Sequence, residues 1–88
     1  MPAAQRSGDV NTGGGVVTGS SPNVLINGLP AVVAGDPVAP HANNHAASVT
    51  VGGSGSVLIN GRPAIRTGDV DACGDARVGG SPNVLIGG

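Results

Sequence analysis

The sequence predicts an all-β fold, a small cone of three pseudo-threefold β-hairpin repeats. Three observations predict it. One hairpin unit occurs twice in full, at residues 21–36 and 54–69. The chain begins with the second half of that unit and ends with the first half, so the two ends supply a third copy. Glycines recur at fixed places beside β-branched runs, a pattern typical of turns.

The composition limits the size of the core and the class of partner. The chain has 88 residues, with 17 glycines, one cysteine and no aromatic residue. We expect one domain over residues 1–88 with a small aliphatic core. Chains this short usually need an additional stabilising cross-link, such as a bound metal ion. A single cysteine excludes an internal disulfide. The formal net charge is −1 and lysine is absent, which argues against nucleic acid as a partner.

No membrane or export signal is recognisable in the sequence. It contains no apolar run of 18 residues and does not open with the basic and apolar regions of a cleaved signal peptide. We therefore expect a soluble protein that is cytoplasmic before any assembly and that is exported, if at all, by a route without a cleaved leader.

The first half of the chain holds one unpaired strand and one hairpin. Residues 2–9 read as a lone strand ending at a Gly-Asp pair, and a glycine-rich loop follows over residues 10–20. The first complete hairpin, residues 21–36, has two apolar runs around Asn27-Gly28. Asn-Gly between apolar runs is the strongest short-range hairpin signal.

The second half repeats this plan with a longer connection. Residues 37–53 are six residues longer than the other two connections, and the insertion brings His41 and His45. A strand is expected at residues 48–51. The second hairpin spans residues 54–69, and a loop over residues 70–80 carries the only cysteine. Loops that grow often carry function.

The final strand, residues 81–88, has no partner after it, and strand 2–9 has none before it. Unpaired edges are a liability, so we expect these two strands to pair and to close the third repeat. The termini would then lie close together, and the three loops would converge at one end. An open solenoid would need at least three whole repeats with caps.

The repeats also resemble a known family. Pro63-Ala64-Ile65-Arg66, preceded by Asn60-Gly61-Arg62 and followed by Gly68-Asp69, resembles the motif of PAAR-repeat proteins, and residues 3–6 and 30–33 are looser copies. The resemblance implies a cone that caps the trimeric β-helical, VgrG-like spike of type VI secretion systems or the central spike of related phage-like tails. It also implies one structural zinc ion near the vertex.

The metal ligands implied by the resemblance are His41, His45 and Cys73. Imidazole and thiolate are suitable zinc ligands, and zinc usually takes four. The family often has a further ligand where this chain has Gly13. The fourth position stays open between Asp75, Asp71, an asparagine side chain, a water and another group. The choice between zinc and iron is also open.

Other repeated polar residues are interpreted as structural. Three aspartates follow glycine at equivalent places and are expected to bond nearby backbone N–H groups. Arginines are expected to pair with these aspartates or to be solvated, although a stripe for partner contact is an alternative. These residues are Asp9, Asp36 and Asp69, with Arg6, Arg62 and Arg66.

Each repeat also has a Val-Leu-Ile triplet, at residues 24–26, 57–59 and 84–86. Neighbouring strand residues point to opposite faces, so the leucines or the Val/Ile pairs face a partner. A threefold set of exposed apolar positions suits a trimer.

The predicted function is a structural spike tip that sharpens a contractile injection machine for membrane puncture, bound as one copy per trimeric spike and touching the target membrane transiently. Effector chains are a further expected partner. We expect no enzymatic activity. One alternative is a small zinc-dependent hydrolase, with Asp75 as the nearest base in a chain that lacks glutamate. The other is a stand-alone β-solenoid binding module. Such a module would have flat ladders of threonine, whereas the four threonines of this chain are scattered.

Overall fold

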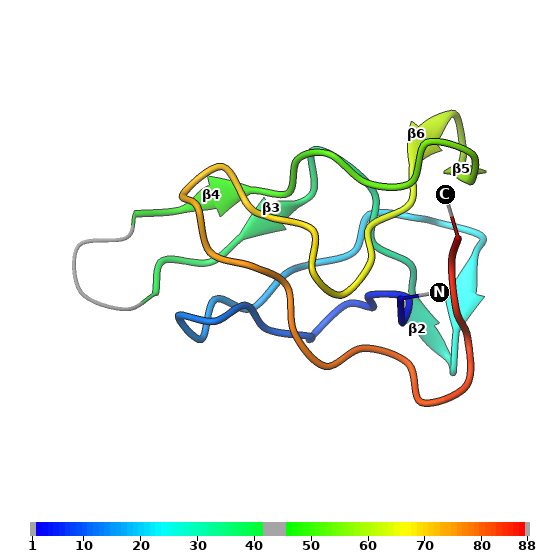
Figure 1. Ribbon diagram of the computed structural model, residues 1–88, viewed down its shortest axis with the longest axis horizontal. Helices are drawn as coiled ribbons and strands as arrows, with labels where there is room; N and C mark the ends of the chain where they lie inside the picture. The colour runs from blue at the N-terminus through cyan, green and yellow to red at the C-terminus, as the bar shows by residue number, and fades with distance from the viewer. Residues whose placement is uncertain (1, 42–45, 88) are drawn as a thin grey trace.

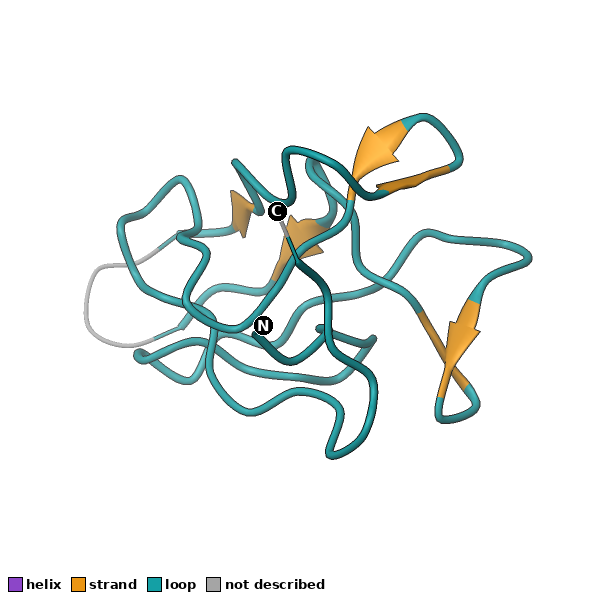
Figure 2. Cartoon of the chain, turned by 45° about the vertical axis from the view of Figure 1, so that its right-hand side comes forward, coloured by secondary structure: helices purple, strands orange, loops and turns teal. Residues whose placement is uncertain are grey.

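The computed structural model describes residues 2–41 and 46–87, and the molecule is elongated, with extents of 32 × 23 × 23 Å. Within these residues there are six strands of two residues each, paired as three antiparallel sheets, and most of the chain is loop (Figure 2). The strands are β1 (Leu25–Ile26), β2 (Leu29–Pro30), β3 (Pro37–Val38), β4 (Ser48–Val49), β5 (Leu58–Ile59) and β6 (Arg62–Pro63). The predicted all-β class is confirmed.

The strands are shorter than expected, and β3 lies in a segment that was predicted to be a connection. Proline has no N–H for a ladder, and β2 and β6 both end at proline, Pro30 and Pro63. Single β-bridges continue the pairing beyond the strands. The predicted hairpins therefore exist as tight turns with short ladders.

Both predicted Asn-Gly turns are present. Asn27 and Gly28 have φ of 53° and 82°, and Asn60 and Gly61 have φ of 53° and 83°. Two successive residues with positive φ define the turn whose twist matches a β-hairpin. The register that follows pairs Ile26 with Leu29 in one hairpin and Ile59 with Arg62 in the other.

The two ends of the chain pair, as predicted. Ala3 bridges Leu85, the Ala4 N–H donates to the Val84 carbonyl at 2.9 Å, and the Ile86 N–H donates to the Pro2 carbonyl at 2.8 Å. Both termini lie at the end of the molecule that holds β1–β2 and β5–β6 (Figure 1). The third repeat is thus completed by the joined ends.

A ring of three backbone hydrogen bonds relates the repeats. Gln5 donates to Ile65 at 3.1 Å, Ile65 donates to Val32 at 3.0 Å, and Val32 donates to Gln5 at 3.3 Å. The three residues occupy equivalent places in the repeats and are at most 1% exposed. Each repeat therefore makes the same bond to its neighbour, which establishes the pseudo-threefold closure.

The core has two apolar layers, and it settles the orientation of the triplets. Ile26, Ile59 and Ile86 are 6–8% exposed and belong to one buried cluster, whereas the leucine before each of them is exposed. That cluster also contains Ala4, Ala31, Val33 and Ala64. A second cluster contains Val17, Val32, Val38 and Ile65.

The loops converge at the end opposite the two hairpins, where β3 and β4 lie (Figure 1). Three equivalent bridges link them: Asn11 with Arg77, Val17 with Val38, and Thr50 with Asp71. This convergence was predicted from the threefold pattern. No helix in residues 2–41 and 46–87 has the length and apolar character to cross a membrane.

Candidate metal centre

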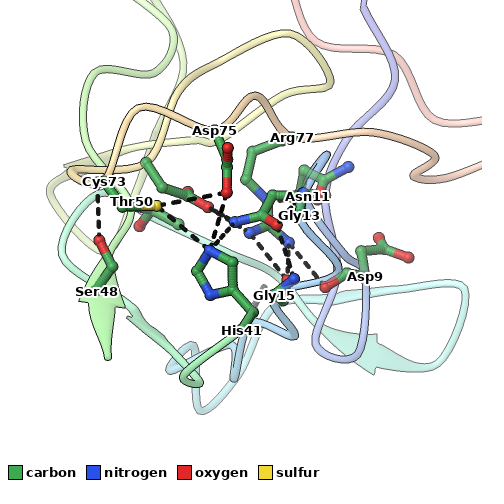
Figure 3. A network of polar contacts seen from close by, with 12 residues as sticks. Asp9, Asn11, Gly13, Gly15, His41, Ser48, Thr50, Cys73, Asp75 and Arg77 are labelled. Atoms are coloured by element: carbon green, nitrogen blue, oxygen red, sulfur yellow. Dashed lines mark hydrogen bonds and ion pairs between the residues drawn. The ribbon is translucent and has the colours of Figure 1, made fainter. Parts of the chain in front are cut away.

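Three potential ligands meet at the loop end. His41 follows β3, and Cys73 and Asp75 come from the loop over residues 70–80. His41 Nε2 lies 3.4 Å from Cys73 Sγ and 3.1 Å from Asp75 Oδ2, and Sγ lies 3.8 Å from Oδ2 (Figure 3). Ligand atoms of these three residues all lie within 4.8 Å of one another.

The distances fit a tetrahedral metal site. Zinc–nitrogen, zinc–oxygen and zinc–sulfur bonds of roughly 2.0–2.3 Å in tetrahedral geometry put ligand atoms about 3.4–3.6 Å apart. The three separations bracket this range. One imidazole, one thiolate and one carboxylate are also a suitable donor set for zinc. The residues present can therefore form a metal-binding site.

The His41 ring is oriented for this role by its own backbone neighbourhood. Nδ1 lies 2.7 Å from the Ala39 carbonyl, so the neutral ring carries its proton on Nδ1 and turns the Nε2 lone pair toward Cys73 and Asp75. A carbonyl behind a metal-binding histidine fixes its tautomer in this way. The same hydrogen bond raises the pKa of His41, opposed by burial and assisted by Cys73 and Asp75.

A tight turn presents Cys73 and Asp75 together. The Asp71 N–H donates to the Asp75 carbonyl and the Gly74 N–H donates to the Asp71 carbonyl, both at 2.8 Å. Gly74 has φ of +97°, which L residues with a side chain rarely adopt. The Cys73 N–H donates to Ser48 Oγ at 3.1 Å, which ties this turn to β4.

The first loop, residues 10–20, packs closely against the His41 ring and forms a further side of the candidate site. A Cβ on Gly15 would lie 2.5 Å from His41 Nδ1, so only glycine lets the backbone approach the ring. The Gly13 and Gly15 N–H groups donate to Asn11 Oδ1 at 3.0 and 2.7 Å. The first loop thus supports the histidine through Asn11, and Gly13 has no side chain to offer a ligand.

A buried polar network lies behind the candidate ligands. Asn11 Nδ2 lies 3.1 Å from His41 Nε2 and donates to Asp71 Oδ2 at 2.7 Å. Arg77 Nη1 donates to the same oxygen at 2.8 Å, and both charged side chains are 0% exposed. Arg77 Nε donates to Gln5 Oε1 at 3.1 Å. The network therefore runs from the apolar core to the histidine.

The site contains two of the three predicted ligands. His41 and Cys73 meet as predicted, and Asp75, one of the alternatives for the fourth place, joins them. Asp71, another alternative, instead bonds Arg77 and Asn11. His45 lies outside the described residues, so its assignment as a ligand stays a prediction.

Sequence reasoning missed Asn11 and Arg77. A signal existed, because Asn11 and Asp71 each follow a Gly-Asp aspartate by two residues, and polar residues at both places imply a shared polar layer.

The repeated aspartates have the structural role predicted for them. Asp9, Asp36 and Asp69 each accept a hydrogen bond from the backbone N–H three residues earlier, at 2.7, 2.8 and 2.7 Å. Arg6 and Arg66 form ion pairs with Asp9 and Asp69 at 3.1 and 3.0 Å. The side-chain hydrogen bonds to Asp9 and Asp69 raise the pKa of the Arg6 and Arg66 guanidiniums, respectively.

The fold and the site together define a closed, pseudo-threefold all-β protein with a candidate metal site at one end. A family model, the PAAR motif, matches residues 7–79. Because the match covers most of the chain, the protein belongs to the PAAR-motif family, which is structural rather than enzymatic. A comparison with curated proteins finds no match.

Proposed function

We propose that this protein is the tip of a contractile injection machine. One copy caps the trimeric β-helical spike, a VgrG-like protein or a phage central spike, and sharpens it for puncture of a membrane that it touches transiently. The PAAR motif supports a spike-tip function in general. The protein would be cytoplasmic before assembly and then lie at the tip of the particle.

The observation that carries this proposal is a threefold set of exposed leucines at the hairpin end. Leu25, Leu58 and Leu85 are 60%, 61% and 53% exposed, and they occupy the same place in the three repeats. Large aliphatic side chains so exposed mark an interaction surface when they form a set. A trimer offers three equivalent contacts, and this one chain matches them.

The backbone beside the leucines supports the same partner. Val24 and Val57 accept hydrogen bonds across their hairpins from Ala31 and Ala64, both at 3.0 Å. Hydrogen-bonded and non-hydrogen-bonded pairs alternate along antiparallel strands, so the N–H and C=O of Leu25 and Leu58 point away from the hairpin partner. Such an outward edge is a template for another strand, as a β-helical partner supplies.

The opposite end would be pinned by one structural metal ion, which we propose is zinc. His41, Cys73 and Asp75 would hold it, with His45 as the predicted further ligand. Zinc supplies cross-linking between loops that are distant in sequence, and structural sites of this kind contribute directly to folding. A rigid tip is what a puncturing device needs, and no catalysis is proposed.

The test is a binding experiment with a purified trimeric β-helical spike protein from a contractile system. Native mass spectrometry should show one copy of this chain per trimer. Changing Leu25, Leu58 and Leu85 together to aspartate should abolish binding, because charges would enter an apolar contact. Leu29→Asp, at a residue 41% exposed on β2, is the matched control and should retain binding. Three copies per trimer, or full binding by the triple variant, would contradict the proposal.

A further inference from the structure

The three repeats differ in the residue that lies three positions before the repeated aspartate, and we call this place in each repeat its corner. In two repeats an arginine pairs with the aspartate three residues later: Arg6 Nη2 lies 3.1 Å from Asp9 Oδ1, and Arg66 Nη2 lies 3.0 Å from Asp69 Oδ1. The first repeat, residues 21–36, has Val33 at the equivalent place before Asp36. One guanidinium is therefore missing from an otherwise repeated arrangement.

The missing side chain leaves space beside β5–β6. Arg6 Nη1 donates to Asn27 Oδ1 at 3.3 Å, and Arg66 Nη1 donates to the Gly87 carbonyl at 3.4 Å. Both contacts join an arginine to the residue after the isoleucine of a neighbouring repeat, Asn27 in one case and Gly87 in the other. Val33 is too short to make the equivalent contact with Asn60, and a cavity of about 330 Å³ lies between them. This volume is near the lower end of the range for ligand sites, about 300–1,000 Å³.

The cavity has an apolar side and a polar side. Pro22, Val33 and Ile59 line the first, and Ser20, Ser21, Asn60 and Arg62 line the second. No carboxylate is among these lining residues. Asp36 is 1% exposed, and its oxygens accept hydrogen bonds from the Ser20 hydroxyl, the Ser20 N–H and the Val33 N–H. The Asp36 carboxylate therefore adjoins the lining without being part of it, and the lining itself carries one positive charge.

Arg62 is the source of this charge. The other three arginines each form an ion pair with an aspartate, whereas Arg62 has no ion pair or hydrogen bond within residues 2–41 and 46–87. The first repeat has Leu29 at the equivalent place. A guanidinium offers five donors in a fork that matches a carboxylate.

Ser21 offers a second donor. Its Oγ accepts hydrogen bonds from the Val24 N–H at 3.0 Å and from Asn60 Nδ2 at 3.3 Å. A hydroxyl has one proton as well as its lone pairs, so the proton of Ser21 is available to a further acceptor. Arg62 and Ser21 together provide the donors that an anionic oxygen pair requires.

We propose that this cavity binds an acidic side chain of a partner protein, with its carboxylate on Arg62 and Ser21 and a neighbouring apolar residue against Val33 and Ile59. Only the first repeat has valine in place of arginine, so the described residues form this site once. A threefold spike would not select one corner, and the partner is therefore a second protein bound in a one-to-one ratio. The inference does not depend on the proposed spike-tip function.

The probe is the capped peptide acetyl-Ala-Val-Glu-Val-Ala-amide, titrated into the ¹⁵N-labelled, metal-loaded protein and followed by amide chemical shifts. We expect saturable shifts confined to residues 20, 21, 33 and 59–62. The peptide with Gln in place of Glu should bind at least about tenfold more weakly, because it lacks the charge that strengthens the hydrogen bonds. Equal binding of the two peptides would overturn the proposal.

Two variants copy residues that the other repeats already tolerate. Arg62→Leu removes the charge, and Val33→Arg refills the cavity. Each variant should therefore abolish the peptide-induced shifts, while its own amide spectrum remains that of a folded protein. Leu29→Arg is the control and should bind as the wild type does. Acetate that binds as tightly as the peptide would also contradict the proposal, because the occupant would then be a free small anion.

Discussion

At the hairpin end, all three repeats turn isoleucine inward and leucine outward, whereas at the loop end they place Asn11, Val38 and Asp71 at equivalent positions. The backbone is nevertheless the same at the loop end. Thr12 donates to Ala76 at 2.9 Å, Ala39 to Val16 at 2.9 Å, and Ala72 to Val49 at 2.8 Å.

The contrast between equal residues at the hairpin end and unequal residues at the loop end matches two different requirements, those of a threefold partner and those of a metal ion. A threefold partner needs three equal contacts, so identical residues suit the hairpin end. The candidate metal ligands come from two of the loops, His41 from one and Cys73 with Asp75 from another, so the loop end does not need three equal residues. The shared backbone permits both, because its hydrogen bonds do not depend on which side chains the repeats carry. The following predictions test this division.

The largest expected effect is the loss of the metal. Wild-type protein purified without chelator should hold about one equivalent of zinc, and Cys73→Ser should hold almost none. Apparent binding free energies of structural zinc are on the order of 10–16 kcal/mol, so the variant should also unfold at a much lower temperature. Metal analysis and thermal unfolding measure the two effects. Leu85→Ser, at the hairpin end, should keep its metal; wild type that is metal-free after gentle purification would refute the site.

The next effect concerns the buried ion pair behind the site. Asp71→Ala leaves the Arg77 charge buried without its partner, which costs about 3–5 kcal/mol in such cases. Replacing both residues by valine, as the equivalent positions Val38 and Val17 have, should cost less than the single change. Urea unfolding of the metal-free proteins measures both. A double variant less stable than Asp71→Ala would show that the polar layer is not replaceable by an apolar one.

The third prediction compares neighbours in one strand. Ile26→Ala should destabilise the protein by about 2–5 kcal/mol because it opens a cavity in the core. Leu25→Ala should stay within roughly 0.5 kcal/mol of wild type, as surface changes usually do, while weakening binding to a trimeric spike. Equal losses of stability would mean that the leucines are also part of the core.

The smallest effect is a pH dependence in the metal-free protein. The hydrogen bond to Ala39 raises the pKa of His41 in the folded state, so protonation of His41 favours folding. This contribution is complete below the unfolded pKa of about 6.5 and is lost as pH rises through the folded pKa. The urea midpoint between pH 5 and 8 should show it, and His41→Gln should remove it. The metal-loaded protein should behave oppositely, because protons compete with the metal for its ligands.

Much of the fold follows from local chemistry. Asn27-Gly28 and Asn60-Gly61 predict their turns because Asn and Gly accept positive φ. The split unit predicts that strands 2–9 and 81–88 pair, because each half would otherwise leave an open edge. The aspartates after glycine predict their own backbone contacts, since those partners are only three residues away.

Other features depend on contacts across long sequence separations. The alternation of a strand puts Leu25 and Ile26 on opposite faces but does not say which face is inside. The closed ring of repeats decides this by bringing the three isoleucines into one buried cluster. Asn11 and Asp71 are 60 residues apart, so only their equivalent places in the repeats relate them in the sequence.

The sequence by itself determined the threefold repeat, the turns and the meeting of His41 with Cys73, because equal units closed in a ring bring equal loops together. The tertiary structure decided that Asp75 joins them, that the leucines face solvent, and that Arg62 lies beside a cavity with no ion pair to the residues that the structure describes. These outcomes depend on distances of a few ångströms between side chains, which repeat symmetry does not specify where the repeats differ.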